Sequence, residues 1–184
     1  MRHPSLLSNP DTVLVVVDVQ QKLMNVIHER DRVIENTVKL IEAAKVLSIP
    51  TLATTQIAEK LGGFCEPVQR ALSDIDLIDK TTFSCAGSER FSEALRQMMR
   101  KQVLICGVEC HVCVNQTAHD LLAEGCQVHV ATDAVSSRTP ENWRAGVEKM
   151  RDSGCIITST ETAIFELTQD ADRPEFRQIH KLVK

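Results

Sequence analysis

The chain has few aromatic residues, no long apolar run and no excess of basic charge. Its 184 residues include one Trp, five Phe and no Tyr, which is too little for the aromatic platforms on which nucleic-acid bases stack. The formal net charge of −4 also disfavours nucleic acid and anionic membrane as partners. No apolar run approaches the roughly 20 residues of a membrane span, and no apolar signal-peptide segment follows Arg2. We therefore expect a cytoplasmic protein.

A disulfide framework is not indicated either. The chain has seven cysteines, an odd number, and 43% of its residues are hydrophobic, so it can form one core without covalent cross-links. Cys106 and Cys155 lie inside apolar runs, where a thiol behaves as a small hydrophobic group. We expect most of the cysteines to be reduced and structural.

Apolar runs alternate with segments of helical periodicity along the whole chain. The runs that predict strands are 12–17, 51–55, 75–78, 103–106, 127–131 and 155–158. The segments that predict helices are 32–47, 67–72, 89–100, 112–122, 140–151 and 160–167. The strand runs are continuously apolar, which is typical of a parallel sheet covered by helices on both faces.

This order of elements predicts an α/β fold, namely a doubly wound three-layer sandwich around a parallel six-stranded sheet with strand order 3-2-1-4-5-6. No linker, repeat or low-complexity stretch divides the chain, so we expect a single domain over residues 1–184. In such a fold the ligand crevice lies beyond the carboxyl ends of the strands.

Three chemically useful side chains fall at those strand ends. Asp18 follows the first expected strand, Lys80 follows the third, and Cys113 begins the helix after the fourth. The first and fourth strands are neighbours, so Asp18 and Cys113 are expected to meet, with Lys80 reaching across the second strand. A helix N-terminus stabilises a thiolate, which makes Cys113 the candidate nucleophile. Each residue alone also has a structural interpretation: a helix cap, a solvated charge and an inert thiol, respectively.

Four short motifs occur together over most of the chain. They are Val-Asp-Val-Gln at 17–20, Asp-Lys-Thr-Thr-Phe-Ser at 79–84, Gly-Val-Glu-Cys-His-Val-Cys-Val at 107–114 and Asp-Ala-Val-Ser-Ser-Arg at 133–138. In this combination the chain resembles the isochorismatase-like cysteine hydrolase superfamily, which includes nicotinamidases and carbamoylsarcosine amidohydrolases. Its ending at 174–183 is similar to that of the subgroup named isochorismatase domain-containing proteins.

The resemblance implies a catalytic triad of Asp18, Lys80 and Cys113. It also implies a cis peptide bond between Val108 and Glu109, with the backbone N–H groups of Glu109 and Cys113 forming an oxyanion hole. The implied reaction is hydrolysis of a small amide or related C–N bond through a thioester. Lys80 and the helix N-terminus would lower the thiol pKa, while Asp18 would accept the thiol proton, return it to the leaving amine and then activate water.

Two departures from the superfamily narrow this expectation. Nicotinamidases carry a metal site built on an Asp-x-His motif after the second strand, whereas residues 54–63 contain no His here. We therefore expect no metal and no other cofactor, and a small molecule as substrate. Isochorismatases proper hydrolyse a vinyl ether and lack the cysteine, so the presence of Cys113 means that the family name does not give the reaction. Ether hydrolysis stays as one alternative function. A catalytically silent binding or scaffold protein of the same fold is another.

Two metal-binding alternatives share the cysteine-rich motif. Cys106, Cys110 and Cys113 have the C-x3-C-x2-C spacing of iron–sulfur radical enzymes. The two later cysteines could also suggest zinc, together with His111 and His119. Both alternatives are disfavoured because some of these residues are expected on a buried strand and others on a helix, where they do not easily converge.

Four further residues are expected near the crevice as candidate substrate-pocket residues, namely Gln20, Gln56, Phe83 and His111. Each could instead support a loop, and His111 could support a turn or a subunit contact. We also expect a homo-oligomer, with a dimer as its minimum unit. The apolar residues at 163–167 and Trp143 are candidate interface material, although both could simply cover the sheet.

Overall fold

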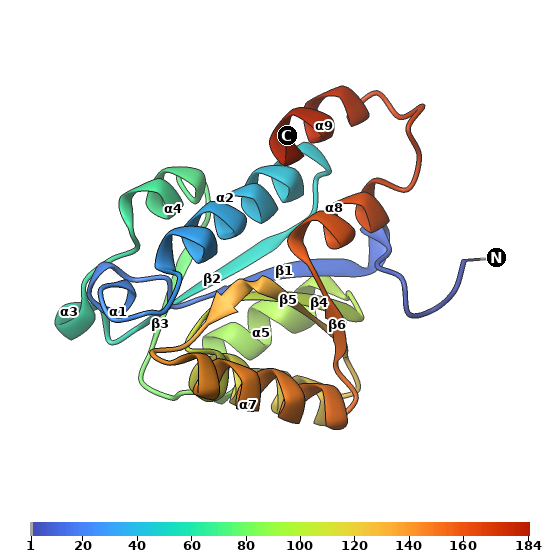
Figure 1. The fold of residues 1–184 in the computed structure, drawn as a ribbon. Coiled ribbons are helices and arrows are strands. Elements are labelled where there is room, and N and C mark those ends of the chain that lie inside the picture. The colour runs from blue at the N-terminus through green and yellow to red at the C-terminus, as the bar shows by residue number, and fades with distance from the viewer. Residues whose placement is uncertain (1) are drawn as a thin grey trace.

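The computed structural model describes residues 2–184 and contains the predicted six-stranded parallel sheet (Figure 1). Its strands are β1 (Thr12–Val17), β2 (Thr51–Gln56), β3 (Leu77–Lys80), β4 (Gln102–Val108), β5 (Gln127–Ser136) and β6 (Ile156–Thr158). The order in space is β3-β2-β1-β4-β5-β6, and every neighbouring pair is parallel. The predicted fold class and strand order are confirmed.

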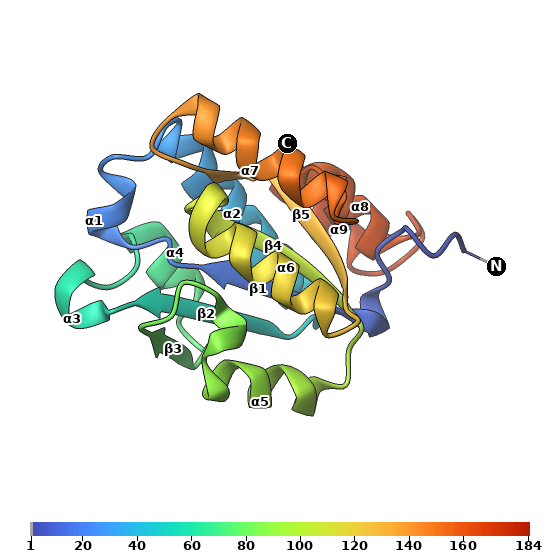
Figure 2. The same ribbon diagram turned by 90° about the horizontal axis from the view of Figure 1, so that it is seen from below.

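Helices cover both faces of the sheet (Figures 1 and 2). One layer holds α2 (Arg30–Val46), α4 (Glu66–Ala71), α8 (Thr160–Thr168) and α9 (Phe176–Val183). The other holds α5 (Glu89–Met98), α6 (Asn115–Ala123) and α7 (Pro140–Asp152). Alternate β1 side chains enter the two cores, Leu14 and Val16 on the first side and Val13, Val15 and Val17 on the second. A strand buried on both faces must be apolar throughout, which is why this run lacks alternation.

Two elements differ from the sequence-based expectation. Strand β3 begins at Leu77, whereas Ile75 closes a turn through its N–H bond to the Leu72 carbonyl. Lys80 is therefore the last residue of the strand and does not follow it. Helix α9 was not predicted, and Ile179 is the side chain that it buries completely. The sequence held a usable signal for it, because Phe176, Ile179, Leu182 and Val183 keep helical spacing.

Gly107 brings the carboxyl ends of β1 and β4 together. It is the register partner of Val17 and has φ +116°. A Cβ at this position would lie 2.0 Å from the Val17 carbonyl oxygen, so no larger residue fits without moving the backbone. Because of this close approach, Asp18 emerges directly beside the turn that follows β4.

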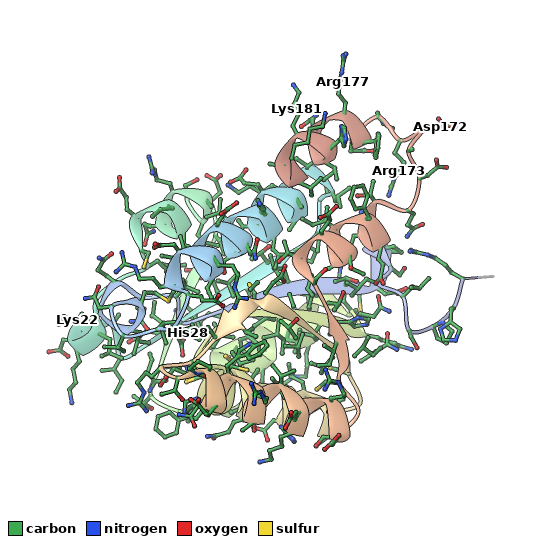
Figure 3. All side chains as sticks on the ribbon, viewed as in Figure 1. Lys22, His28, Asp172, Arg173, Arg177 and Lys181 are labelled. Atoms are coloured by element: carbon green, nitrogen blue, oxygen red, sulfur yellow. The ribbon has the colours of Figure 1, made fainter. Side chains whose placement is uncertain are left out.

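Two short helices, α1 (Gln21–Met24) and α3 (Ala58–Leu61), mark this carboxyl edge. Lys22 Nζ donates to the Lys60 carbonyl at 2.6 Å and so ties the two together. Figure 3 shows Lys22 and His28 at this end of the molecule, away from Arg177 and Lys181 on α9. None of the helices in residues 2–184 has the length and apolar character needed to cross a membrane.

Candidate active site

Asp18 follows β1 directly and is completely buried. Its Oδ1 accepts a hydrogen bond from the Thr54 hydroxyl at 2.8 Å, and its backbone N–H donates to the Thr54 carbonyl at 3.0 Å. Thr54 is the register partner of Val17, so the pairing of β1 with β2 places this hydroxyl beside the carboxylate. Burial raises the pKa of Asp18, and neighbouring charge and hydrogen bonds, above all the Lys80 ammonium, oppose the rise.

Lys80 extends from the end of β3 across β2 to the same carboxylate. Its Nζ lies 2.7 Å from Asp18 Oδ2 and 2.7 Å from Gln56 Oε1. The carbonyl oxygens of Thr82 and Phe83 lie 3.2 and 3.3 Å away. The ammonium thus has four oxygen neighbours although the side chain is removed from solvent. This is how the fold holds a buried cation without leaving it unpaired.

Cys113 lies in the π-helical turn Cys110–Val114, which links β4 to α6. The residue is 7% exposed. Burial raises the pKa of its thiol to about 12, the Asp18 charge adds to the rise, and Lys80 opposes it. The expected lowering of the thiol pKa is therefore wrong in direction. Loss of hydration and the neighbouring carboxylate outweigh the ammonium, and neither effect can be read from sequence spacing.

The structure therefore brings Asp18, Lys80 and Cys113 together. Asp18 and Lys80 are in direct contact, and Asp18 and Cys113 each influence the other's pKa. At neutral pH the raised pKa favours a protonated thiol beside the carboxylate–ammonium pair. Such an arrangement can pass the thiol proton to the carboxylate when an electrophile arrives.

Sequence reasoning missed Thr54 and Cys85. The Thr54 hydroxyl bonds Asp18, and Cys85 Sγ lies 3.6 Å from that hydroxyl, in the 3-10 turn Cys85–Gly87. A polar residue paired with the last position of β1 was a usable signal for Thr54. Cys85 had no such signal, because its place depends on how this turn packs against α6.

Gln20 and Gln56 have structural contacts of different kinds. Gln20 is fully buried, donates to the carbonyls of Gln56 and Gly62, and accepts from the Gln56 N–H at 2.7 Å. It therefore joins the two loops after β1 and β2. The Gln56 side chain contacts Lys80 and donates to the Thr81 carbonyl, so it orients the ammonium.

Phe83 and His111 are the pocket candidates that reach solvent. The Phe83 residue is 55% exposed, and its own backbone carbonyl accepts a hydrogen bond from Lys80 Nζ. His111 is half-buried, and its Nδ1 lies 2.9 Å from Ser137 Oγ. The His111 backbone N–H also donates to Ser137 Oγ at 3.4 Å. His111 thus links the turn after β4 to the end of β5.

Glu109 is anchored through its side chain. Its Oε2 accepts from the backbone N–H and from Nε of Arg138, each at 3.1 Å. Its carbonyl accepts from the N–H groups of Val112 and Val114, which begins the π-helical turn. The peptide bond between Val108 and Glu109 is cis. The implied oxyanion donors, the Glu109 and Cys113 N–H groups, belong to this one anchored turn.

A hollow of about 670 Å³ lies away from these residues. It lies between α1, α2 and α4, with Met24, Ile34 and Cys65 among its lining residues. A hollow of about 210 Å³ lies beside Lys80 and is lined by Thr82 and Gly87. The buried ion pair of Asp18 and Lys80 lies outside the larger hollow, so the candidate active site is at the contacts of Asp18.

The cysteine-rich motif is not assembled as a metal centre. No group of three or more potential metal ligands converges within residues 2–184. Cys110 Sγ donates to the Trp143 carbonyl at 3.6 Å. Both ring nitrogens of His119 are within hydrogen-bond distance of protein oxygens, Asn115 O and Ser153 Oγ. All seven cysteines are free thiols.

Comparison with known proteins gives the family. The isochorismatase domain family matches residues 12–162. The secreted isochorismatase effector Isc1 of Phytophthora sojae is 42% identical over 177 residues, which cover 94% of this chain and 84% of that protein. Isochorismatase domain-containing protein 2 of Danio rerio is 34% identical over 178 residues, covering 96% and 89% of the two chains.

A solved structure agrees with this relationship. The MAR1 ribonuclease of Caenorhabditis elegans superposes with a TM-score of 0.91 at 34% identity, covering 97% of this chain and 92% of that one. The match therefore extends through the sheet, both helix layers and the strand ends that carry Asp18, Lys80 and Cys113. On its sequence and its fold together, the chain belongs to the isochorismatase family of hydrolases.

Proposed function

We propose that the protein hydrolyses a small amide or a related C–N bond, with Cys113 as nucleophile and a thioester as intermediate. The observation that carries this proposal is the buried Asp18–Lys80 pair, whose charged atoms lie 2.7 Å apart beside the Cys113 thiol. A buried ion pair is a costly way to stabilise a fold. It is useful where a carboxylate must stay ionised next to a proton donor.

The first half of the reaction moves one proton and forms one bond. Cys113 gives its proton to Asp18 while its sulfur attacks the substrate carbonyl, and the C=O π electrons move to the oxygen. Because burial holds the thiol pKa near 12, free thiolate is scarce, and proton transfer accompanies attack. Lys80 offsets the negative charge in this space, and the N–H groups of Glu109 and Cys113 would bind the oxyanion.

The second half restores the enzyme. The tetrahedral intermediate collapses, the C–N bond breaks, and Asp18 returns the proton to the leaving nitrogen, which departs as ammonia or an amine. Water then attacks the thioester while Asp18 accepts its proton. The C–S bond breaks, the acid product leaves, and Cys113 regains its proton. No step needs a metal, so dialysis against a chelator should leave turnover intact.

Cleavage of RNA is the main competing reaction, because the C. elegans relative is named a ribonuclease. The formal net charge of −4 disfavours an anionic phosphodiester, and the Lys80 ammonium is already paired with Asp18. Vinyl ether hydrolysis is disfavoured because the thiol and its proton acceptor match attack on a carbonyl carbon. A catalytically silent scaffold of the same fold would not need the buried Asp18–Lys80 pair, since such a pair is a costly way to stabilise a fold.

A panel of small amides, ureides and carbamoyl compounds, assayed by ammonia release, tests the proposal. A single-stranded RNA and a vinyl ether serve as separate arms. We expect turnover of at least one C–N substrate that Cys113→Ala abolishes, and that Asp18→Asn lowers by about 10²–10⁴-fold. RNA or ether cleavage that survives Cys113→Ala, with no C–N turnover, would assign a different reaction to the fold.

A further inference from the structure

The proposed reaction leaves one buried thiol beside the site unused. Cys85 is completely buried, and its Sγ lies 3.6 Å from Thr54 Oγ1. Its backbone N–H donates to Thr117 Oγ1 at 2.8 Å. Thr117 lies on α6, one helical turn beyond Cys113, so the Cys85 turn is fixed to the element that follows the nucleophile.

The direction of the Cys85–Thr54 contact follows from the number of protons. The Thr54 hydroxyl has one proton, and Asp18 Oδ1 accepts it at 2.8 Å. A carboxylate has no proton to return, so Thr54 Oγ1 can only accept from its other neighbour. The Cys85 S–H must then be the donor in this contact. Burial raises the pKa of Cys85 to about 11, so the thiol keeps this proton at neutral pH.

We propose that Cys85 is a positioning residue, which acts on Asp18 through Thr54. A series of hydrogen bonds runs from Cys85 S–H through Thr54 O–H to Asp18 Oδ1, and it keeps the hydroxyl proton directed at the carboxylate. Hydrogen bonds in series polarise one another, so the thiol strengthens the Thr54–Asp18 bond. This inference rests on the proposed role of Asp18 as proton acceptor.

The effect on Asp18 has a definite sign. The titratable groups that face its carboxyl are the Lys80 ammonium from β3 and the Cys113 thiol from the turn before α6, with Cys85 behind Thr54. A hydrogen bond to the carboxylate favours its charged form. Weakening that bond should therefore move the ionisation of Asp18 to higher pH, while Lys80 and Cys113 stay in place.

The test uses the full chain and needs no known substrate. The rate at which iodoacetamide alkylates Cys113 is measured from pH 5 to 9 by peptide-resolved mass spectrometry. If Asp18 assists removal of the thiol proton, the rate falls on the acid side as Asp18 becomes protonated, and Asp18→Asn removes this acid limb. We expect Cys85→Ala to move the limb upward by roughly 0.2–0.5 pH unit.

Two variants separate the hydrogen bond from packing. Cys85→Ser keeps a donor at nearly the same place and should restore the wild-type limb. Cys106→Ala removes another completely buried thiol, in the core on the other side of the sheet, and should leave the limb unchanged. An unmoved limb in Cys85→Ala, or an equal shift in Cys85→Ser, would overturn the inference.

Thr54→Val covers the case in which Cys85→Ala folds poorly, because it deletes the link itself and should move the limb upward on its own; an unmoved limb would contradict the inference. Where Cys85→Ala folds, Thr54→Val should shift the limb at least as far as that variant does. In a double-mutant cycle, Cys85→Ala added to Thr54→Val should have no further effect, because the path to Asp18 is already cut; an additional shift would contradict the inference. A wild-type profile without any limb that depends on Asp18 is a different result, which removes the proposed role of Asp18 itself.

Discussion

Lys80 Nζ lies 2.7 Å from Asp18 Oδ2, and both side chains are fully removed from solvent. The pair joins the ends of β3 and β1, which are separated in the sheet by β2. Removing one member of such a pair leaves a buried charge without its partner, which is more harmful than replacing both. The pair therefore contributes both to the stability of the carboxyl edge and to its chemistry. Suitable variants can separate these two contributions.

Lys80→Ala should raise the pKa of Cys113 further, because the ammonium is the charge that opposes its rise. The alkylation rate of Cys113 at neutral pH should fall. The same variant should lose about 3–5 kcal/mol in its free energy of unfolding, since Asp18 is left unpaired.

The matched control is Asp18→Asn combined with Lys80→Met, which removes both charges. Its unfolding free energy in urea should recover most of the loss, while Cys113 should remain slow to alkylate. An unchanged alkylation profile in Lys80→Ala would show that Lys80 is not the electrostatic partner of the thiol.

Gly107→Ala should be strongly destabilising. Its Cβ would lie 2.0 Å from the Val17 carbonyl oxygen in a backbone with φ +116°, so β1 and β4 would have to separate. We expect a loss of more than about 3 kcal/mol in urea unfolding. Gly125→Ala is the control, because Gly125 has φ +84° but open space around its Cβ, and it should lose only about 1 kcal/mol. Equal losses would contradict the close approach.

His129 should make the fold sensitive to mild acid. Burial lowers its pKa to about 4, its Nδ1 has no hydrogen-bond partner within residues 2–184, and the unfolded chain titrates near 6.5. Below pH 6.5 the unfolded state binds a proton that the folded state does not bind until about pH 4. Stability should therefore fall as pH drops through this window, by up to about 2 kcal/mol between pH 7 and 5.

The variant His129→Asn lacks the titrating imidazole. Comparing it with the wild type therefore isolates the contribution of His129 to the pH dependence of stability. Urea unfolding at pH 7 and pH 5 should show a smaller loss for this variant than for the wild type. Parallel losses in the two proteins would show that another group causes the acid sensitivity.

The expected homo-oligomer remains a prediction, but most of the residues expected at its interface are covered by the chain itself. Ala163, Ile164 and Leu167 are buried within the chain's own core, whereas Phe165 is 37% exposed. Trp143 donates from Nε1 to the Thr132 carbonyl, so it too packs within the chain. Light scattering at micromolar concentration should give at least twice the chain mass, since a dimer is the smallest unit expected. A single species of monomer mass would refute this.

The carboxyl edge shows what sequence reasoning could reach. Asp18, Lys80 and Cys113 could be placed together because parallel strands end at one edge and the strand order fixes which ends are neighbours. The direction of the Cys113 pKa shift could not be predicted, because it depends on burial that no local pattern records. The role of Gln20 likewise depends on the loop at Gly62, which is 42 residues away.

The central claim is that Cys113 is the nucleophile, and limited alkylation tests it most directly. Wild-type protein is treated with substoichiometric iodoacetamide at neutral pH, and all seven cysteines are followed by peptide mass spectrometry. Cys126 is the most accessible thiol, because the other six are buried, so exposure alone predicts that it reacts first. The account predicts that Cys113 reacts first, with Asp18 as its proton acceptor. Labelling of Cys126, Cys65 or Cys85 while Cys113 stays untouched would contradict it.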